Sequence, residues 1–224
     1  MPVALFLLFL VVAGAFLYLS WWQREHRRRA FATTAAGMGL THAQGDPFGL
    51  VELPFVLFRQ GDGRGVDHVM HGRWQDMDVK AFDYWFFVRR SDGRGMSHRE
   101  YRRYSCVLLS LDVTCPITSI GPETMLTRLA DKIGAGDIDF ESEEFNRKME
   151  VKSTDRRFAS YLLDARMMEW LLQARKVSFE LSGRSLLCYE GRFAPPMYAT
   201  LLDLAAAFRS RIPRVVHDIY GSVR

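Results

Sequence analysis

The chain opens with an uninterrupted apolar stretch and only afterwards takes on the mixed polarity of a soluble protein. No charged side chain occurs from Val3 to Trp22, and arginines follow within a few residues. A helix of about 20 residues rises about 30 Å, which matches the hydrocarbon thickness of a bilayer. The pattern therefore predicts a transmembrane anchor over residues 1–23.

A cleaved secretory signal is the alternative interpretation of this stretch. Such a signal carries a basic start and small residues at its cleavage site. Here only Met1 and Pro2 precede the apolar run, and the bulky Tyr18, Trp21 and Trp22 stand at its end. Because amphipathic aromatic rings favour the headgroup layer, we expect an uncleaved anchor.

Basic residues beside a spanning helix stay on the cytoplasmic side. Here they follow the helix, which predicts a single-pass protein of the cell inner (plasma) membrane with its amino terminus outside and its C-terminal domain in the cytoplasm. The residues expected to hold the anchor at the headgroups are Trp21, Trp22, Arg24, Arg27, Arg28 and Arg29.

Behind the anchor the spacing of apolar positions changes. Residues 24–46 are predicted as a basic juxtamembrane helix, ended by Gly37 and Gly39, and a loop from His42 to Pro47. The strand candidates that follow are residues 53–58, 66–72, 79–88 and 104–112, the last two joined in an antiparallel meander. The run 79–88 is aromatic at consecutive positions, so we expect it to be covered on both faces.

The second half mixes both periods. Apolar residues at helical spacing predict helices over 122–133, 155–174 and 197–212, the second as one helix or as two that part near Asp164. A short strand is expected at Met149–Lys152. Alternation on both sides of Ser182-Gly183-Arg184 predicts a hairpin with one wet face.

These elements predict an α+β fold. One soluble domain over residues 47–213 would hold six to eight strands in a mostly antiparallel sheet, packed by amphipathic helices, and residues 214–224 would be a frayed tail. The more specific expectation is a curled sheet with a capping carboxy-terminal helix, similar to a pleckstrin-homology barrel.

Composition excludes some function classes. The formal net charge is +4, but four positive charges are the arginines beside the anchor, so the domain itself is close to neutral and no nucleic-acid partner is expected. The spacing of Cys106, Cys115 and Cys188 matches no zinc or redox motif, and we expect free thiols in a reducing compartment. No cofactor and no metal are predicted.

Three motifs invite a chemical interpretation. Asp-Gly-Arg-Gly occurs at residues 62–65 and 92–95, but neither copy completes a phosphate-binding loop, and we interpret both as turns. His68 and His71 would point to opposite faces of a strand, so we expect surface or turn residues there, with His42 isolated. The acidic stretch 137–144 could hold a cation or act as acid and base, although such runs are usually solvated.

The densest basic patch of the domain surrounds the second of these turns. A solvated loop is the simplest interpretation, and anionic lipid headgroups fit a tethered domain better than RNA does. The predicted binding patch comprises Arg89, Arg90, Arg99, Arg102 and Arg103.

The segment Phe140–Val151, with the sequence FESEEFNRKMEV, is followed by Asp155 and by Tyr161–Met168. With these residues the chain resembles the DUF3137 family of uncharacterised, often membrane-anchored bacterial proteins, over residues 135–190. The resemblance implies no catalytic residues. It implies that Phe145 is a core contact and that Asn146 caps or turns the chain before the strand at Met149.

Two classes of function follow. The first is a membrane-anchored cytoplasmic module without catalytic activity that binds a protein partner or a lipid headgroup at the inner membrane face. The alternative is a membrane-associated enzyme with a site near the acidic segment 137–144. No serine or cysteine nucleophile has a recognisable partner pattern, which favours the binding module.

Overall fold

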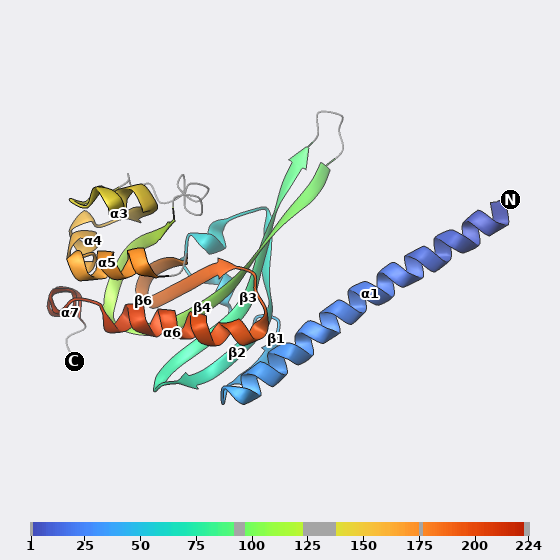
Figure 1. Ribbon diagram of the computed structural model, residues 1–224, viewed down its shortest axis with the longest axis horizontal. Helices are drawn as coiled ribbons and strands as arrows, with labels where there is room; N and C mark the ends of the chain where they lie inside the picture. Colours follow the sequence, from blue (N-terminus) through green and yellow to red (C-terminus); the bar gives the residue numbers. More distant parts are fainter. Residues whose placement is uncertain (1, 92–96, 123–137, 175–176, 222–224) are drawn as a thin grey trace.

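The structure is a computed structural model that describes residues 2–91, 97–122, 138–174 and 177–221. A long helix, α1 (Pro2–Gly37), extends away from a domain built on an antiparallel sheet (Figure 1). The strands are β1 (Thr41–Gln44), β2 (Gly63–Trp74), β3 (Met77–Ser91), β4 (Ser97–Pro122), β5 (Met149–Ser153) and β6 (Ser178–Gly191). The shorter helices are α3 (Glu143–Lys148), α4 (Arg156–Leu162), α5 (Ala165–Gln173), α6 (Tyr198–Ser210) and α7 (Arg214–Tyr220), with 3-10 turns η1 (Leu50–Glu52), η2 (Leu57–Arg59) and η4 (Pro195–Met197).

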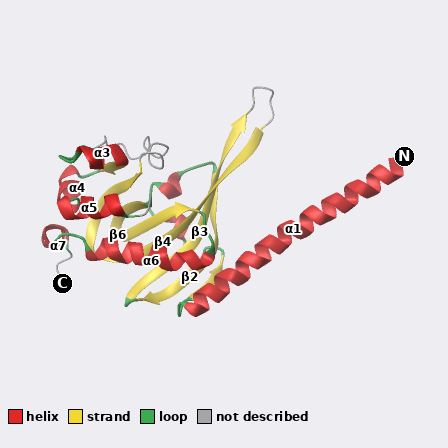
Figure 2. Cartoon of the chain, viewed as in Figure 1, coloured by secondary structure: helices red, strands yellow, loops and turns green. Residues whose placement is uncertain are grey.

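The sheet is open and is organised around the long strand β4. Strands β1, β2, β3 and β4 follow one another, β3 and then β5 pair with successive parts of β4, and β6 pairs with β4 along the opposite edge. Every pairing is antiparallel. Figure 2 shows the shorter helices α3 to α7 gathered against this sheet, with the β3–β4 hairpin projecting beyond them and α1 extending away from the domain.

Apolar side chains cover both faces of the sheet. On one face Val79 and Ala81 of β3 join a core with the carboxy-terminal part of α1 and with α4 to α7. On the other face Phe82, Tyr84 and Phe86 pack under the segment that contains η1 and η2. The prediction that this strand is covered on both sides is therefore confirmed, except toward its end, where Val88 is exposed.

Helix α1 is the candidate membrane anchor. Among the described residues, the helical stretch Phe6–Gly37 is long and apolar enough to cross a membrane, with a mean hydropathy of 1.8 in its most apolar window, and no part of that window is buried. Further along, Phe31 and Ala35 are fully buried against the domain. The helix runs without a break from the apolar segment into the domain and ends at Gly37, as expected for the predicted juxtamembrane helix.

The α+β class, the meander and most helices are as expected. Strand β5 lies at the predicted position, and the helical region 155–174 is two helices, because Asp164 caps α5 by accepting a hydrogen bond from the Met167 backbone. Phe145 is fully buried, and the Asn146 side chain bonds both the N–H and the carbonyl of Phe140. Residues 123–133 of the expected helix 122–133 lie outside the described residues.

Four expectations are wrong. The segment predicted as a loop from residue 42 includes most of strand β1. Residues 53–58 form no strand and instead cover one face of the sheet, because periodicity alone does not distinguish a short buried strand from another buried apolar segment. The hairpin at Ser182-Gly183-Arg184 is the middle of the continuous strand β6, where Gly183 has a φ of 55° and the register with β4 shifts. The tail is not frayed throughout, because α7 buries Val216.

Candidate functional site

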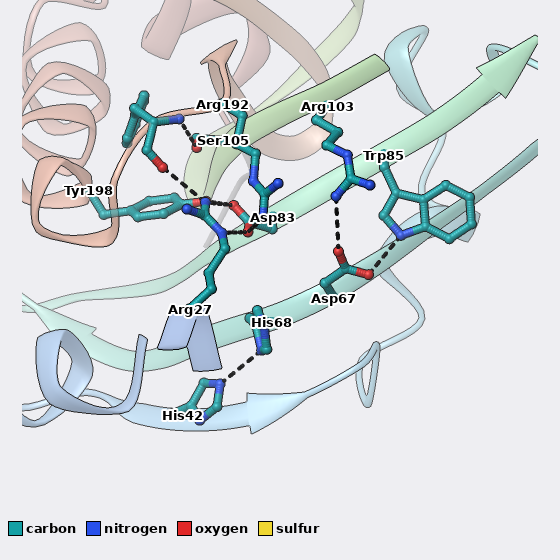
Figure 3. A network of polar contacts seen from close by, with 11 residues as sticks. Arg27, His42, Asp67, His68, Asp83, Trp85, Arg103, Ser105, Arg192 and Tyr198 are labelled. Atoms are coloured by element: carbon teal, nitrogen blue, oxygen red, sulfur yellow. Dashed lines mark hydrogen bonds and ion pairs between the residues drawn. The ribbon is translucent and has the colours of Figure 1, made fainter. Parts of the chain in front are cut away.

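A network of polar contacts lies where α1 meets the sheet, and Figure 3 shows its members. At its centre is Asp83 of β3, whose residue exposure is only 3%. Arg27 of α1 donates from Nε to Oδ2 of Asp83 at 2.5 Å and from Nη2 to Oδ1 at 2.7 Å. This two-point geometry orients as well as attracts.

The same network ties in the segment that follows β6. Arg27 Nη2 also donates to the carbonyl of Phe193 at 2.9 Å, and the Tyr198 hydroxyl of α6 donates to Asp83 Oδ1 at 2.9 Å. The Arg192 guanidinium lies 3.6 Å from Asp83 Oδ2. We call these five residues, Arg27, Asp83, Arg192, Phe193 and Tyr198, the anchor lock.

Burial and charge act on the lock together. Burial would lower the pKa of Arg27, but the hydrogen bond and negative charge of Asp83 outweigh it, so the pKa is raised. Burial lowers the pKa of Arg192 despite the same carboxylate. Burial and the Asp83 charge raise the pKa of Tyr198 well above its usual value. The lock is therefore a buried carboxylate held among two guanidinium cations and a hydroxyl whose proton burial and the Asp83 charge retain.

A histidine pair lies beside the lock. Nε2 of His42 in β1 is 3.4 Å from Nδ1 of His68 in β2, and the ring of Phe31 packs against both. Burial lowers the pKa of each imidazole. The expectation that His68 is a surface residue and His42 isolated is wrong, because β1 brings His42 onto β2.

The network continues along the sheet through Asp67. Trp85 Nε1 donates to Asp67 Oδ1 at 2.8 Å, and the Arg103 guanidinium lies 4.0 Å from the other carboxylate oxygen. Two glycines of β2 make room for the aromatic rings of β3. A Cβ on Gly65 would lie 2.8 Å from the Trp85 ring, and one on Gly63 would lie 2.5 Å from the Phe87 ring. The Gly63 and Gly65 positions, expected in a turn, thus belong to a strand.

Most of the predicted membrane-anchoring residues are exposed on α1, whereas one of them is directed into the domain. Trp21 and Trp22 are exposed on the helix, and Arg28 and Arg29 both bond Glu25, lowering the pKa of that carboxyl to about 2. Arg24 is exposed. Arg27, in contrast, is directed into the domain, where its side chain is 17% exposed. Its ion pair with Asp83 of β3 gives Arg27 a role in docking the helix, which its position beside the membrane segment did not indicate.

The predicted binding patch lies on the β3–β4 hairpin. Arg90 and Arg102 both pair with Glu100, whereas Arg89, Arg99 and Arg103 lie on the other face. Residues 92–96, which include the second Asp-Gly-Arg-Gly motif, are outside the described residues. The structure therefore separates the patch into two groups with different partners.

The acidic segment forms no cluster with a histidine in the described part of the chain. Ser142 caps α3, Glu143 and Glu144 occupy its first turn, and Glu144 pairs with Lys148. Asp137 lies outside the described residues. Within those residues, no group of three or more His, Cys, Asp and Glu side chains is placed to hold a metal ion.

Sequence reasoning missed Asp83, Arg192 and Tyr198. A signal for Asp83 was present, since a single carboxylate between Phe82 and Tyr84 in a buried strand requires a partner. The partners could not be identified from the sequence, because Arg27 is 56 positions away and Tyr198 is 115 positions away.

No protein-family model and no curated protein matches the sequence. Among solved structures, the chain is similar to the crystal structure of the mycobacterial trehalose monomycolate transport factor A, with a TM-score of 0.59 and 12% sequence identity. The similarity covers 88% of this chain and 97% of that chain. At this identity the likeness shows a shared fold.

Proposed function

We propose that the chain is a single-pass membrane-anchored module without catalytic activity, whose domain binds a protein partner at the cytoplasmic face of the membrane. The observation that supports this most is the anchor lock, which joins the apolar helix to the sheet without a flexible linker. A domain held at a fixed height and angle above a bilayer can present one surface to a neighbouring integral membrane protein.

The structural likeness adds to this proposal. The similar chain is described as a transport factor, and an accessory role beside a membrane transport protein would use both the spanning helix and the rigid domain. The resemblance of residues 135–190 to DUF3137 proteins, which are often membrane-anchored, supports the same architecture. Both oxygens of Asp83 accept hydrogen bonds from Arg27, and Oδ1 also accepts one from Tyr198, so this carboxylate is occupied by structural contacts.

The orientation is tested with a single engineered thiol. All three native cysteines are buried, so Ser160→Cys on the exposed surface of α4 supplies the reactive site. A membrane-impermeant maleimide should label this thiol in inside-out membrane vesicles and leave it unlabelled in right-side-out vesicles. Labelling in right-side-out vesicles alone would place the domain outside.

The partner is tested by crosslinking and pull-down from native membranes. The full chain should recover a membrane protein that is lost both from a version lacking residues 1–23 and from Asp83→Asn, which keeps the helix but loosens the lock. If the truncated version recovers the same partners and also pellets with membranes, the anchor is not what brings the domain to them. If Asp83→Asn recovers them at the full level, the fixed geometry is not needed.

A further inference from the structure

The β3–β4 hairpin projects beyond the rest of the sheet (Figure 1). Its two faces differ in how their arginines are paired with carboxylates. Side chains alternate along β3, so Trp85, Phe87 and Arg89 share the face that carries Asp83. Across the ladder these residues pair with Arg103, Tyr101 and Arg99. We call this set of six residues the basic–aromatic face.

Of the three arginines on this face, Arg103 lies 4.0 Å from a carboxylate oxygen of Asp67, and the side chains of the other two have no acidic partner among the described residues. On the opposite face Arg90 and Arg102 share the carboxylate of Glu100. On the basic–aromatic face, no carboxylate of the described residues forms an ion pair with the side chain of Arg89 or Arg99. Arg99 lies over the Phe87 ring at 4.8 Å, Arg103 over the Tyr101 ring at 5.8 Å, and Tyr101 is 45% exposed.

The anchor lock fixes the height of this face above the bilayer. Arg27 and Asp83 are in contact, so distances along the helix and along the strand start from one point. Trp22 is five residues up the helix, about 7.5 Å, whereas Ser91 is eight residues up the strand, about 26 Å. Figure 1 shows the hairpin and the amino-terminal half of α1 extending toward the same side of the domain. The described part of the hairpin is therefore long enough to reach the level of the interfacial tryptophans when it is inclined to the axis of α1.

We propose that the basic–aromatic face binds the anionic lipid headgroups of the membrane that α1 spans. Guanidinium groups bind phosphate oxygens at two points, and tyrosine and tryptophan rings favour the headgroup layer. The arginines after the helix and those of the hairpin would then contact the same leaflet at two places, which fixes the tilt of the domain. This contact is the same whichever side of the membrane the domain occupies.

The test uses the full chain in vesicles of phosphatidylcholine with or without phosphatidylglycerol. A nitroxide on Ser97→Cys, at the first residue of β4, reports depth through its accessibility to a water-soluble nickel chelate. The same label on Ser160→Cys in α4 reports a part of the domain away from the hairpin. With phosphatidylglycerol the Ser97 label should be protected and the Ser160 label accessible. Arg89→Gln with Arg99→Gln should lower the ratio of bound to free hairpin roughly tenfold or more, because each arginine at an anionic surface contributes roughly fivefold.

A matched control removes two exposed arginines at the other end of the domain, Arg156→Gln with Arg166→Gln, and should leave the Ser97 label protected. Flotation with the vesicles shows that every variant is inserted. The proposal fails if the Ser97 label is as accessible as the Ser160 label in anionic vesicles, or if the hairpin variant protects it as well as the unchanged chain does. It also fails if protection requires added membrane protein, since the face would then bind a protein.

Discussion

Asp83 is one carboxylate that four segments of the chain share. It lies in β3 and accepts hydrogen bonds from α1 and α6, with the Arg192 cation close by. A buried ion pair is weak evidence for net stability, but removing one partner leaves an uncompensated charge, which costs about 3–5 kcal/mol. The residue therefore specifies where the helix docks more than it adds to the core.

Asp83→Asn is expected to lower the free energy of unfolding of the domain by about 3 kcal/mol, because the largely buried Arg27 guanidinium loses its counter-charge. Denaturant titration of the full chain in detergent, followed by tryptophan fluorescence, measures the change. Asp203→Asn serves as the control, since Asp203 is exposed on α6 and should change stability by no more than about 0.5 kcal/mol. Equal midpoints for the two variants would show that the lock does not stabilise the domain.

The histidine pair predicts a loss of stability at acidic pH. Burial lowers the pKa of His42 and His68 below 6.5, so the unfolded chain binds more protons than the native one, and stability falls as pH drops below about 6.5. The variant His42→Gln with His68→Gln should flatten this fall in unfolding titrations at several pH values. A fall as steep as that of the unchanged chain would contradict the assignment.

Glu180 titrates in the same window with the opposite sign. Burial raises its pKa to about 7, although it accepts hydrogen bonds from Tyr189 and from the backbone of Val56 and Leu57. A raised pKa makes the native state bind more protons, so this contribution to stability is lost as pH rises toward 7. The comparison with the histidine variant is therefore needed to separate the two effects.

At the scale of elements, β2 and β3 pack together because glycines on β2 face large aromatic residues on β3. The glycines of β2 oppose Trp85 and Phe87 of β3, and the rings occupy the space that side chains on β2 would fill. Trp85 can then donate to Asp67. The base of the projecting hairpin depends on this packing.

Gly65→Ala is expected to destabilise the domain by about 1–3 kcal/mol, because its Cβ would displace the Trp85 ring. Gly191→Ala is the matched control, since it also lies in a strand but meets no atom within 4 Å. Thermal unfolding of both variants measures the difference. Adding Trp85→Leu to Gly65→Ala should restore part of the loss, and no recovery would mean that the ring is not the cause.

Elements with strong local signals were predictable from the sequence, whereas those that depend on distant partners were not. Asp164 divides the helical region by capping the backbone of α5 three residues later. The alternation of side chains that predicts β4 is visible within residues 104–112 themselves. Strand β1, in contrast, is four residues long and exists through its pairing with β2. The sequence predicts a hairpin turn at Gly183, whereas the structure has a register shift inside β6. A glycine with positive φ is suited to a tight turn and to a bulge alike, so the residue type does not decide between them.

At the scale of the whole molecule, α1 is a continuous helix that is fixed to the domain at Arg27. Any change in helix length above Arg27 moves the bilayer relative to the domain but leaves the lock intact. Each residue adds about 1.5 Å of height and about 100° of rotation. Height and rotation can therefore be varied separately.

Seven alanines inserted after Gln23 should lift the domain about 10 Å with little net rotation. The hairpin would leave the headgroup layer, and the Ser97 nitroxide in anionic vesicles should become accessible to the nickel chelate. Two inserted alanines add only about 3 Å but turn the spanning segment by about 200°. They should preserve the protection of Ser97 and reduce crosslinking to a membrane partner. An unchanged depth of the Ser97 label after the longer insertion would contradict the claim that the length of α1 before Arg27 sets the height of the domain.

The lock also sets an order of events during synthesis. Arg27 emerges early, directly behind the helix that enters the bilayer, yet it bonds the carbonyl of Phe193, which is 166 positions later. Tyr198 follows later still. The ribosome must therefore deliver most of the chain before the lock is complete, although β1, β2 and Asp83 are available to contact the helix earlier. The last contacts that hold the helix form only when Phe193 and α6 arrive.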